Sequence, residues 1–162
     1  MKERMMRLLL EYLKDSKRSD REIAKSIGVS QPTITRMRHR LVKEGVIKEF
    51  TVIPDFTKMG YEIMAITFAK SKMILNPKEK EKATKLVLTN PNIIFVAGAQ
   101  GMGKNGVMIS IHKSFSDFCN FLTNLILETG GYMENHNTML IPLGENIVKP
   151  LSLTYLGEQK ET

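Results

Sequence analysis

The chain has 162 residues and a formal net charge of +7 at pH 7, a length that suits one ordinary domain or two small ones. Its charge is unevenly distributed. Residues 1–50 hold 13 Lys and Arg against 7 Asp and Glu, whereas residues 51–162 hold 11 against 10. A localised positive field is most commonly used to neutralise phosphate. We therefore expect a nucleic-acid-binding N-terminal module followed by a nearly neutral C-terminal one.

The residue types exclude several classes of function. No run of about 18 apolar residues and no signal-peptide pattern is present, so we expect a cytoplasmic protein with no membrane partner. Cys119 is the single cysteine, which excludes an intrachain disulfide and a multi-cysteine metal site. His39, His112 and His136 lack ligand spacing, and no catalytic triad, carboxylate pair or cofactor fingerprint stands out. We expect no metal, no cofactor and no catalytic residue, and hence a protein that is not an enzyme.

Residues 1–53 have the pattern of a helix-turn-helix module. The first helix is predicted over residues 2–15, with an apolar stripe formed by Met6, Leu9, Leu10 and Leu13. Residues 19–22, Ser-Asp-Arg-Glu, match a capping box and begin a second helix, which Gly28 ends through its positive φ. Ser30 then caps a third helix that carries Pro32 in its first turn.

The third helix, over residues 30–41, is predicted to be a recognition helix. Ile34, Met37 and Leu41 have the i, i+3, i+7 spacing of an inward face. The opposite face is basic and polar, and Arg can reach guanine O6 and N7 in a major groove, while hydroxyl and amide groups bond in either sense. The alternative interpretation is a solvated charged surface, because charge runs usually face water.

The expected DNA contacts follow from position on this helix and the segment after it. Base reading is expected from Thr35, Arg36 and His39. Contacts with phosphates, or with base edges at the helix N-terminus, are expected from the polar and basic residues Ser30, Gln31, Thr33, Arg40, Lys43 and Lys48.

A β-branched run over residues 46–53 predicts a strand or a small wing beside the helices. Pro54 and Asp55 end this run, and residues 54–60 are predicted to link the two modules. The first module therefore ends at residue 53.

Residues 61–150 predict a second domain with the element order β-α-β-β-α-β. Its strands are expected over residues 63–69, 93–97, 107–111 and 138–143, with residues 98–106 and 134–137 in loops. One helix begins at Asn76-Pro77 and ends near residue 89; the other begins after Ser114 and stops at Gly130-Gly131. This order is typical of a ferredoxin-like fold, which makes the chain an α+β protein.

The predicted strands are apolar at most positions, so both faces of the sheet are expected to be buried. The helices cover one face, and we expect a second copy of the chain to cover the other, giving a homodimer through the sheet. Residues 151–162 form a C-terminal tail, of which residues 151–156 are expected to add an edge strand.

The loop over residues 98–106 nearly matches the sequence motif of a phosphate-binding loop, Gly-x-x-x-x-Gly-Lys. Asn105 stands where a magnesium-binding hydroxyl is needed, and a strand follows in place of a helix, so no helix N-terminus is available to hold phosphates. A flexible hairpin loop that contacts an effector or a second dimer is the favoured interpretation.

Several segments together have the signature of one family: residues 9–13, 18–24, 28–30, Arg36, residues 40–41, 45–47, 50–55 and Gly60. With these residues the chain resembles the leucine-responsive regulatory protein and asparagine regulator (Lrp/AsnC) family, most closely over its first 70 residues or so. The resemblance implies an N-terminal winged helix-turn-helix, a ferredoxin-like domain that dimerises through its sheet, and further assembly into tetramers or octamers. It also implies a response to an amino acid or related metabolite.

The chain departs from the family pattern at two places. Arg38 stands where the family usually has an apolar residue, and we expect Met37 to take over that packing while Arg38 extends along the rim. The family's turn with an Asp, around which its effectors bind, is replaced by residues 98–106, which contain no Asp. On the resemblance, the effector candidates are Gly98, Gln100, Gly101, Gly103 and Lys104.

The sequence thus predicts a homodimeric, sequence-specific regulator of transcription that binds double-stranded DNA and responds to an amino acid or other small metabolite. The alternative is a metabolite-binding or nucleotide-binding module at residues 98–106, whose basic N-terminal domain serves assembly.

Overall fold

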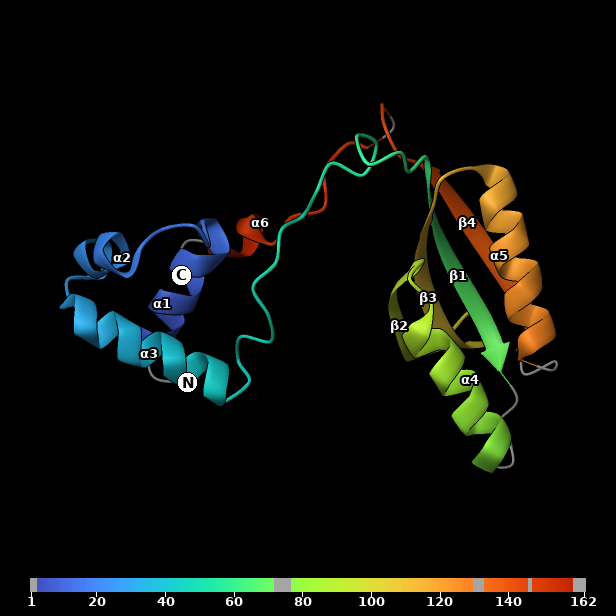
Figure 1. Ribbon diagram of the computed structural model, residues 1–162, viewed down its shortest axis with the longest axis horizontal. Coiled ribbons are helices and arrows are strands. Elements are labelled where there is room, and N and C mark those ends of the chain that lie inside the picture. The colour runs from blue at the N-terminus through green and yellow to red at the C-terminus, as the bar shows by residue number, and fades with distance from the viewer. Residues whose placement is uncertain (1–2, 72–76, 130–132, 146, 159–162) are drawn as a thin grey trace. The chain divides into compact units, whose positions relative to one another are not determined.

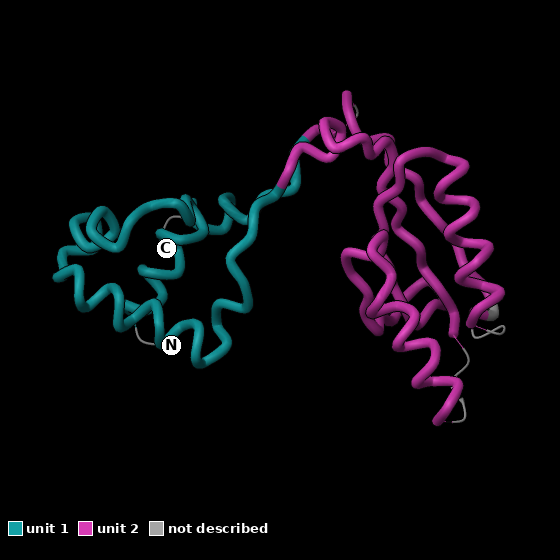
Figure 2. The backbone as a smooth tube through the Cα atoms, viewed as in Figure 1, with its two compact units in different colours: residues 1–53, 149–162 teal, residues 54–148 magenta. Residues whose placement is uncertain are grey.

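The computed structural model describes residues 3–71, 77–129, 133–145 and 147–158 (Figure 1). The chain divides into two compact units, one formed by Met1–Ile53 together with Lys149–Thr162 and the other by Pro54–Val148 (Figure 2). Each unit has its own hydrophobic core.

The N-terminal unit contains the helices α1 (Glu3–Lys14), α2 (Asp20–Ile27) and α3 (Gln31–Lys43). Their shared core is centred on Leu8, Ile23, Ile34 and Leu41, each fully buried. The predicted stripe on α1 is wrong at Met6, which is 42% exposed, whereas Leu9 packs against the core as expected; the buried residues are Met5, Leu8 and Tyr12. Tyr12 belongs to the stripe because its ring is buried while its hydroxyl finds a partner on α2.

The connections between the helices follow the sequence signals closely. The capping box of α2 is confirmed, since Ser19 accepts from the Glu22 amide and Glu22 bonds back to the Ser19 amide. Gly28 has the expected left-handed conformation, with φ of 76°. Ser30 occupies the N-cap position of α3, but its hydroxyl makes no cap bond and instead pairs with the Thr33 hydroxyl at 2.8 Å.

Residues 46–53 follow α3 in an irregular conformation and not as the strand expected from their β-branched pattern. Only Ile47 is buried in this run, whereas Val52 is 73% exposed. The Phe50 ring meets Tyr12 edge-on, 5.9 Å between centroids. A strand requires a neighbouring strand to complete its hydrogen bonds, and none of the described strands lies in this unit.

The C-terminal segment returns to the N-terminal unit, where the short helix α6 (Thr154–Gly157) packs against α1. The edge strand expected over residues 151–156 is therefore wrong. Gly157 is buried at this contact, and a Cβ atom added to it would lie 2.9 Å from the Leu10 carbonyl oxygen. Such close approach is possible only for glycine.

The second unit is the expected ferredoxin-like fold. Its elements are β1 (Ile63–Ser71), α4 (Pro77–Thr89), β2 (Ile93–Gly101), β3 (Lys104–His112), α5 (Phe115–Glu128) and β4 (Met133–Pro142). The four strands form one sheet in the order β2-β3-β1-β4, and all neighbours are antiparallel (Figure 1). The expected boundary residues Asn76, Gly130 and Gly131 lie outside the described residues.

Side chains alternate between the two faces of this sheet. Ala65 and Met108 face the helices and form a core with three residues of α5, Phe118, Phe121 and Leu125. Ile66 is paired with Ile109 and with Met139, so these three share the opposite face. That face carries large apolar side chains exposed in the single chain, among them Phe95 at 50% and Met139 at 62%.

The segment over residues 98–106 is a hairpin, as expected, but most of it belongs to the strands and not to a loop. Strands β2 and β3 extend into it until only Met102 and Gly103 remain as the turn, with φ of 51° and 69°. Two consecutive positive φ values are the mark of a type I′ hairpin turn. Likewise β4 includes residues 134–137, which were expected in a loop. In both places strand pairing overrides the local preference of Gly and Asn for turns.

We predict that Gly157→Val destabilises the N-terminal unit by about 1–3 kcal/mol, because the new side chain must displace the backbone of α1 or α6. Thermal and urea unfolding followed by circular dichroism measure the effect. Gly98→Ala is the control, since a Cβ atom there meets no other atom within 4 Å. A Gly157→Val protein as stable as the wild type would refute the packing of α6 on α1.

Candidate nucleic-acid interface

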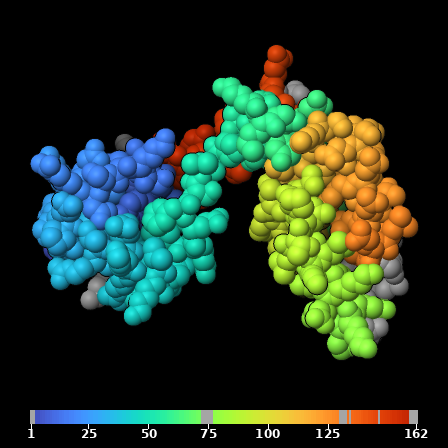
Figure 3. Space-filling view, in the orientation of Figure 1, coloured from blue at the N-terminus to red at the C-terminus, as the bar shows by residue number. Residues whose placement is uncertain are grey.

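The exposed side of α3 collects most of the residues expected to contact DNA. Arg36, His39 and Lys43 are exposed along it, with Gln31 exposed in its first turn. Ile34 and Leu41 are completely buried on the inner side, which fixes the face that α3 turns outward. Figure 3 shows that α3 lies at the surface of the N-terminal unit, so its outer side is open to a ligand.

Two further basic candidates are exposed near the end of the helix. Arg40 donates through Nε to the Glu44 carboxylate at 2.6 Å, an ion pair between two exposed side chains one helical turn apart. Lys48 is exposed in the segment after α3. Because exposed ion pairs contribute little, Glu44 does not prevent Arg40 from contacting a phosphate.

The hydroxyl side chains are engaged within the unit. Thr35 donates to the Asp20 carboxylate at 2.7 Å, which places it on the side of α3 that faces α2. Ser30 and Thr33 share a hydrogen bond at the start of the helix. Thr35 therefore does not belong with Arg36 and His39 on the outer face, although its residue type suggested base reading.

The Asp20 carboxylate joins all three helices of the unit. It accepts hydrogen bonds from the Tyr12 hydroxyl at 3.0 Å, the Thr35 hydroxyl at 2.7 Å, and Arg38 Nε and Nη2 at 3.1 Å each. The two bonds from Arg38 form a bidentate guanidinium–carboxylate pair, which is directional. This network fixes the rotation of α3 about its axis.

Sequence reasoning missed this network, although a signal for it was present. Arg38 occupies an inward-facing position where an apolar residue was expected. Asp20 lies 18 residues earlier, within the capping-box sequence that begins α2. Met37 does pack against the core as expected, but Arg38 is held by Asp20 rather than extended along the rim. A charged residue at a core-facing helix position indicates a buried partner of opposite charge.

The network determines the protonation of its members. Burial alone raises the pKa of Asp20, but hydrogen bonds from Arg38, Thr35 and Tyr12 outweigh burial and hold this pKa below its ordinary value of 3.8. Burial and the hydrogen bond to Asp20 raise the pKa of Tyr12 to about 12. Asp20 is therefore charged and Tyr12 neutral at physiological pH.

Glu11 forms a second acidic hub on α1. A hydrogen bond from Lys14 makes the largest contribution to lowering the pKa of Glu11 from 4.5 to about 2, and hydrogen bonds from Ser26 and Arg18 contribute less. Burial acts in the opposite direction. Ser26 lies on α2 and donates to Glu11 at 2.9 Å, so this carboxylate also connects α1 with α2. The scaffold behind α3 thus depends on two ionised carboxylates.

The sheet unit offers a cavity for a small molecule. A space of about 380 Å³ lies on the helix-covered side of the sheet and is lined mainly by small and aliphatic side chains, among them Thr67, Ala83, Val96, Gly98, Gly106 and Leu125. Of the residues expected to bind an effector, Gly98 lines this cavity. Gln100, Gly101, Gly103 and Lys104 lie at the hairpin tip, where Lys104 Nζ donates to the Asn135 amide oxygen at 2.8 Å.

The remaining buried titratable side chain is His112, in the second unit. His112 is fully buried between Phe118 and Phe121, with Nε2 at 2.8 Å from the Ser110 hydroxyl, and burial lowers its pKa. Among the described residues no group of His, Cys, Asp and Glu side chains is arranged to hold a metal. Within the same ranges, none of the helices is both long and apolar enough to cross a bilayer.

Comparison with known proteins agrees with this architecture. The sequence model of a family described as winged helix-turn-helix DNA-binding matches residues 1–48. The chain is 32% identical, over 134 residues, to the HTH-type transcriptional regulator FL11 of Pyrococcus furiosus, covering 82% of this chain and 84% of that one.

Solved structures extend the similarity to both units. The crystal structure of PH0061 from Pyrococcus horikoshii, 25% identical, matches with a TM-score of 0.78 over 94% of this chain and 97% of that one. The transcriptional regulator NMB0573 of Neisseria meningitidis, solved as a complex with L-Met, is 12% identical and matches with a TM-score of 0.79 over 96% and 99%. At that identity the second match concerns the fold alone.

We predict that Asp20→Asn lowers the free energy of unfolding by about 1–3 kcal/mol at pH 7, because Arg38 loses its counterion. A carboxylate whose pKa is depressed in the folded state contributes stability above its unfolded pKa and loses it as the pH falls through the folded pKa. The wild type should thus weaken between about pH 5 and pH 2, and Asp20→Asn should weaken less steeply.

Urea unfolding at a series of pH values measures both effects. Asp15→Asn removes an exposed carboxylate in the loop after α1 and is the control. Equal stability and equal pH dependence of Asp20→Asn and Asp15→Asn would contradict the role given to Asp20.

Proposed function

This chain belongs to the Lrp/AsnC family of helix-turn-helix transcriptional regulators, and from that membership we propose how it reads DNA and what controls it. It is a DNA-binding regulator of transcription. The observation that carries the proposal is the outer side of α3, where Arg36, His39 and Lys43 are exposed on a helix whose rotation Asp20 fixes.

In this proposal α3 lies in a major groove and divides its contacts between bases and phosphates. Arg36 and His39 read base edges, with Gln31 at the helix N-terminus. Arg40, Lys43 and Lys48 contact the backbone, and Ser30 and Thr33 accompany them at the N-terminal end. Thr35 acts indirectly, since its bond to Asp20 sets the orientation of the helix.

A homodimer supplies two such helices. The sheet face that carries Ile66, Ile109, Phe95 and Met139 is apolar and exposed in the single chain, which supports a second copy as its cover. A two-fold dimer places its recognition helices in successive major grooves about 34 Å apart and selects a pseudo-palindromic operator. Further association of dimers into tetramers or octamers agrees with the family.

An amino acid or a related small metabolite is the proposed effector. Support comes from the L-Met complex of the Neisseria regulator and from the cavity beside Gly98. We assign the effector to Gly98, Gln100, Gly101, Gly103 and Lys104, with the Lys104 ammonium as the group that meets a carboxylate. This assignment makes the β2–β3 hairpin the place where the metabolite is sensed.

Replacement of two basic residues separates base reading from backbone contact. We predict that Arg36→Ala costs about 1–3 kcal/mol on the preferred operator and far less on unrelated DNA. Lys48→Ala should weaken binding to all sequences alike and reduce the slope of log K against log salt by about 1. Fluorescence anisotropy with the operator and a scrambled duplex, at several salt concentrations, measures both.

The operator for these measurements comes from selection of bound fragments from random DNA. Equal losses on both duplexes for Arg36→Ala would remove it from the base-reading set. A wild-type protein that prefers no sequence at low salt would contradict the proposed recognition altogether.

The effector assignment is tested by titrating the protein with the standard amino acids, one at a time, by calorimetry. We expect at least one to bind, and Lys104→Gln to weaken it about tenfold, since a charge-assisted hydrogen bond contributes about 1.5–3 kcal/mol. Lys85→Gln, an exposed position on α4, is the control and should bind as the wild type does. Undiminished binding by Lys104→Gln would place the effector elsewhere, and no binding by any amino acid would argue against this effector class.

A further inference from the structure

A groove runs between the N-terminal turn of α1 and one flank of α3. It encloses about 430 Å³ and is lined by Glu3, Arg4, Met5, Thr33, Arg36, Met37 and Arg40. Met5 is buried and Met37 half-buried, so thioether side chains form its floor, while three arginines stand around them. None of the sequence patterns that predicted the recognition helix pointed to α1 as part of a binding surface.

The groove lies on a definite side of the recognition helix. Thr33, Met37 and Arg40 are separated by three or four residues and therefore share one flank of α3. Thr35 and Arg38 occupy the other flank, where Asp20 of α2 binds both. The exposed face with Arg36 and His39 lies between these flanks, so α1 and α2 border the recognition helix on opposite sides.

Two of the four charged side chains that line the groove are uncompensated. Glu3 forms an ion pair with Arg7 at 2.8 Å, and Arg40 uses Nε on Glu44. Neither Arg4 nor Arg36 has a hydrogen bond or ion pair with another residue in the ranges that the structure describes. Because the proposed function assigns Arg36 to base edges, the Arg4 guanidinium is the group that remains to attract an anion at the open side of the groove.

The dimensions of DNA indicate where a phosphate lies relative to α3. An α-helix with its side chains is about 10–12 Å across, and the major groove is about 12 Å wide. A helix seated there therefore has the phosphates of one strand along each flank. Helix α2 carries the exposed cations Arg21 and Lys25, and the α1 flank of α3 carries Arg4 and Arg40.

We infer that the α1–α3 groove binds the sugar-phosphate backbone of one DNA strand, with Arg4 as a phosphate contact beside Arg40. The inference rests on the proposed function, because it requires α3 to lie in the major groove. The groove suits this occupant in both its apolar and its charged parts. Deoxyribose carbons pack on Met5 and Met37, and the phosphate meets the guanidinium groups of Arg4 and Arg40. A purely apolar peptide would leave those charges without partners.

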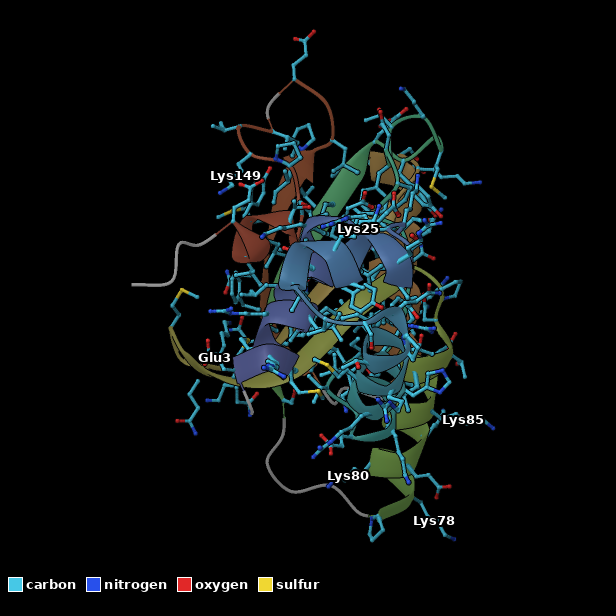
Figure 4. The ribbon with its side chains drawn as sticks, turned by 90° about the vertical axis from the view of Figure 1, so that its left-hand side faces the viewer. Glu3, Lys25, Lys78, Lys80, Lys85 and Lys149 are labelled. Carbon is cyan, nitrogen blue, oxygen red and sulfur yellow. The ribbon has the colours of Figure 1, made fainter. Side chains whose placement is uncertain are left out.

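The test compares Arg4→Gln with Lys85→Gln, which removes the same charge from an exposed position of α4 (Figure 4). Binding of the full-length protein to its selected operator and to a scrambled duplex is measured over a range of salt concentrations. We expect Arg4→Gln to weaken both duplexes by the same factor and to reduce the slope of log K against log salt by about 1. Arg4→Lys should retain the slope, and Lys85→Gln should match the wild type.

Each outcome is decisive. A wild-type protein that binds DNA while Arg4→Gln behaves as Lys85→Gln overturns the groove and leaves the proposed function intact. A wild-type protein that binds no DNA overturns the proposed function itself. A changed oligomeric state of Arg4→Gln in sedimentation, with an unchanged salt slope, assigns the groove to a second copy of the chain and also overturns the inference. Should Arg4→Gln fail to fold, Arg4→Met, which keeps a long helix-forming side chain without the charge, is measured against the same expectation.

Discussion

The rotation of α3 depends on one half-buried carboxylate. Asp20 accepts four hydrogen bonds, which reach it from Tyr12 on α1 and from Thr35 and Arg38 on α3. An apolar core alone holds a helix at the right distance but permits small rotations, because Leu and Ile side chains have no directional bonds. The bidentate bond to Arg38 is directional, so it determines which residues of α3 face outward.

The same constraint sorts the polar residues of α3 into those that stabilise the unit and those that remain available to a ligand. Thr35 and Arg38 are used internally, while Arg36, His39 and Lys43 are left at the surface. With the network on one flank and the α1 groove on the other, the three helices form one surface around α3. In the proposed mode of recognition, sequence specificity arises from a few side chains that the whole unit orients.

The two faces of the sheet in the second unit differ in what they pack against. Its helix-covered face holds the aromatic core of α5 beside a cavity, whereas its other face is apolar and uncovered in the single chain. Exposed apolar area of this kind is unfavourable in water, which supports the proposed homodimer. The C-terminal segment links this unit back to α1, since Gly157 lets α6 approach the Leu10 carbonyl closely.

Local chemistry makes several elements predictable from the sequence: the capping box at Ser19, the left-handed Gly28, the inward face with Ile34 and Leu41, and the β-α-β-β-α-β order. The Asp20–Arg38 pair, the helical return of the C-terminal segment and the tight hairpin at Met102 became visible only in the folded chain. These features depend on contacts between residues distant in the sequence, or on strand pairing that overrides local preference. Arg38 at an inward-facing position signals a partner of opposite charge, but the sequence does not say which carboxylate supplies it.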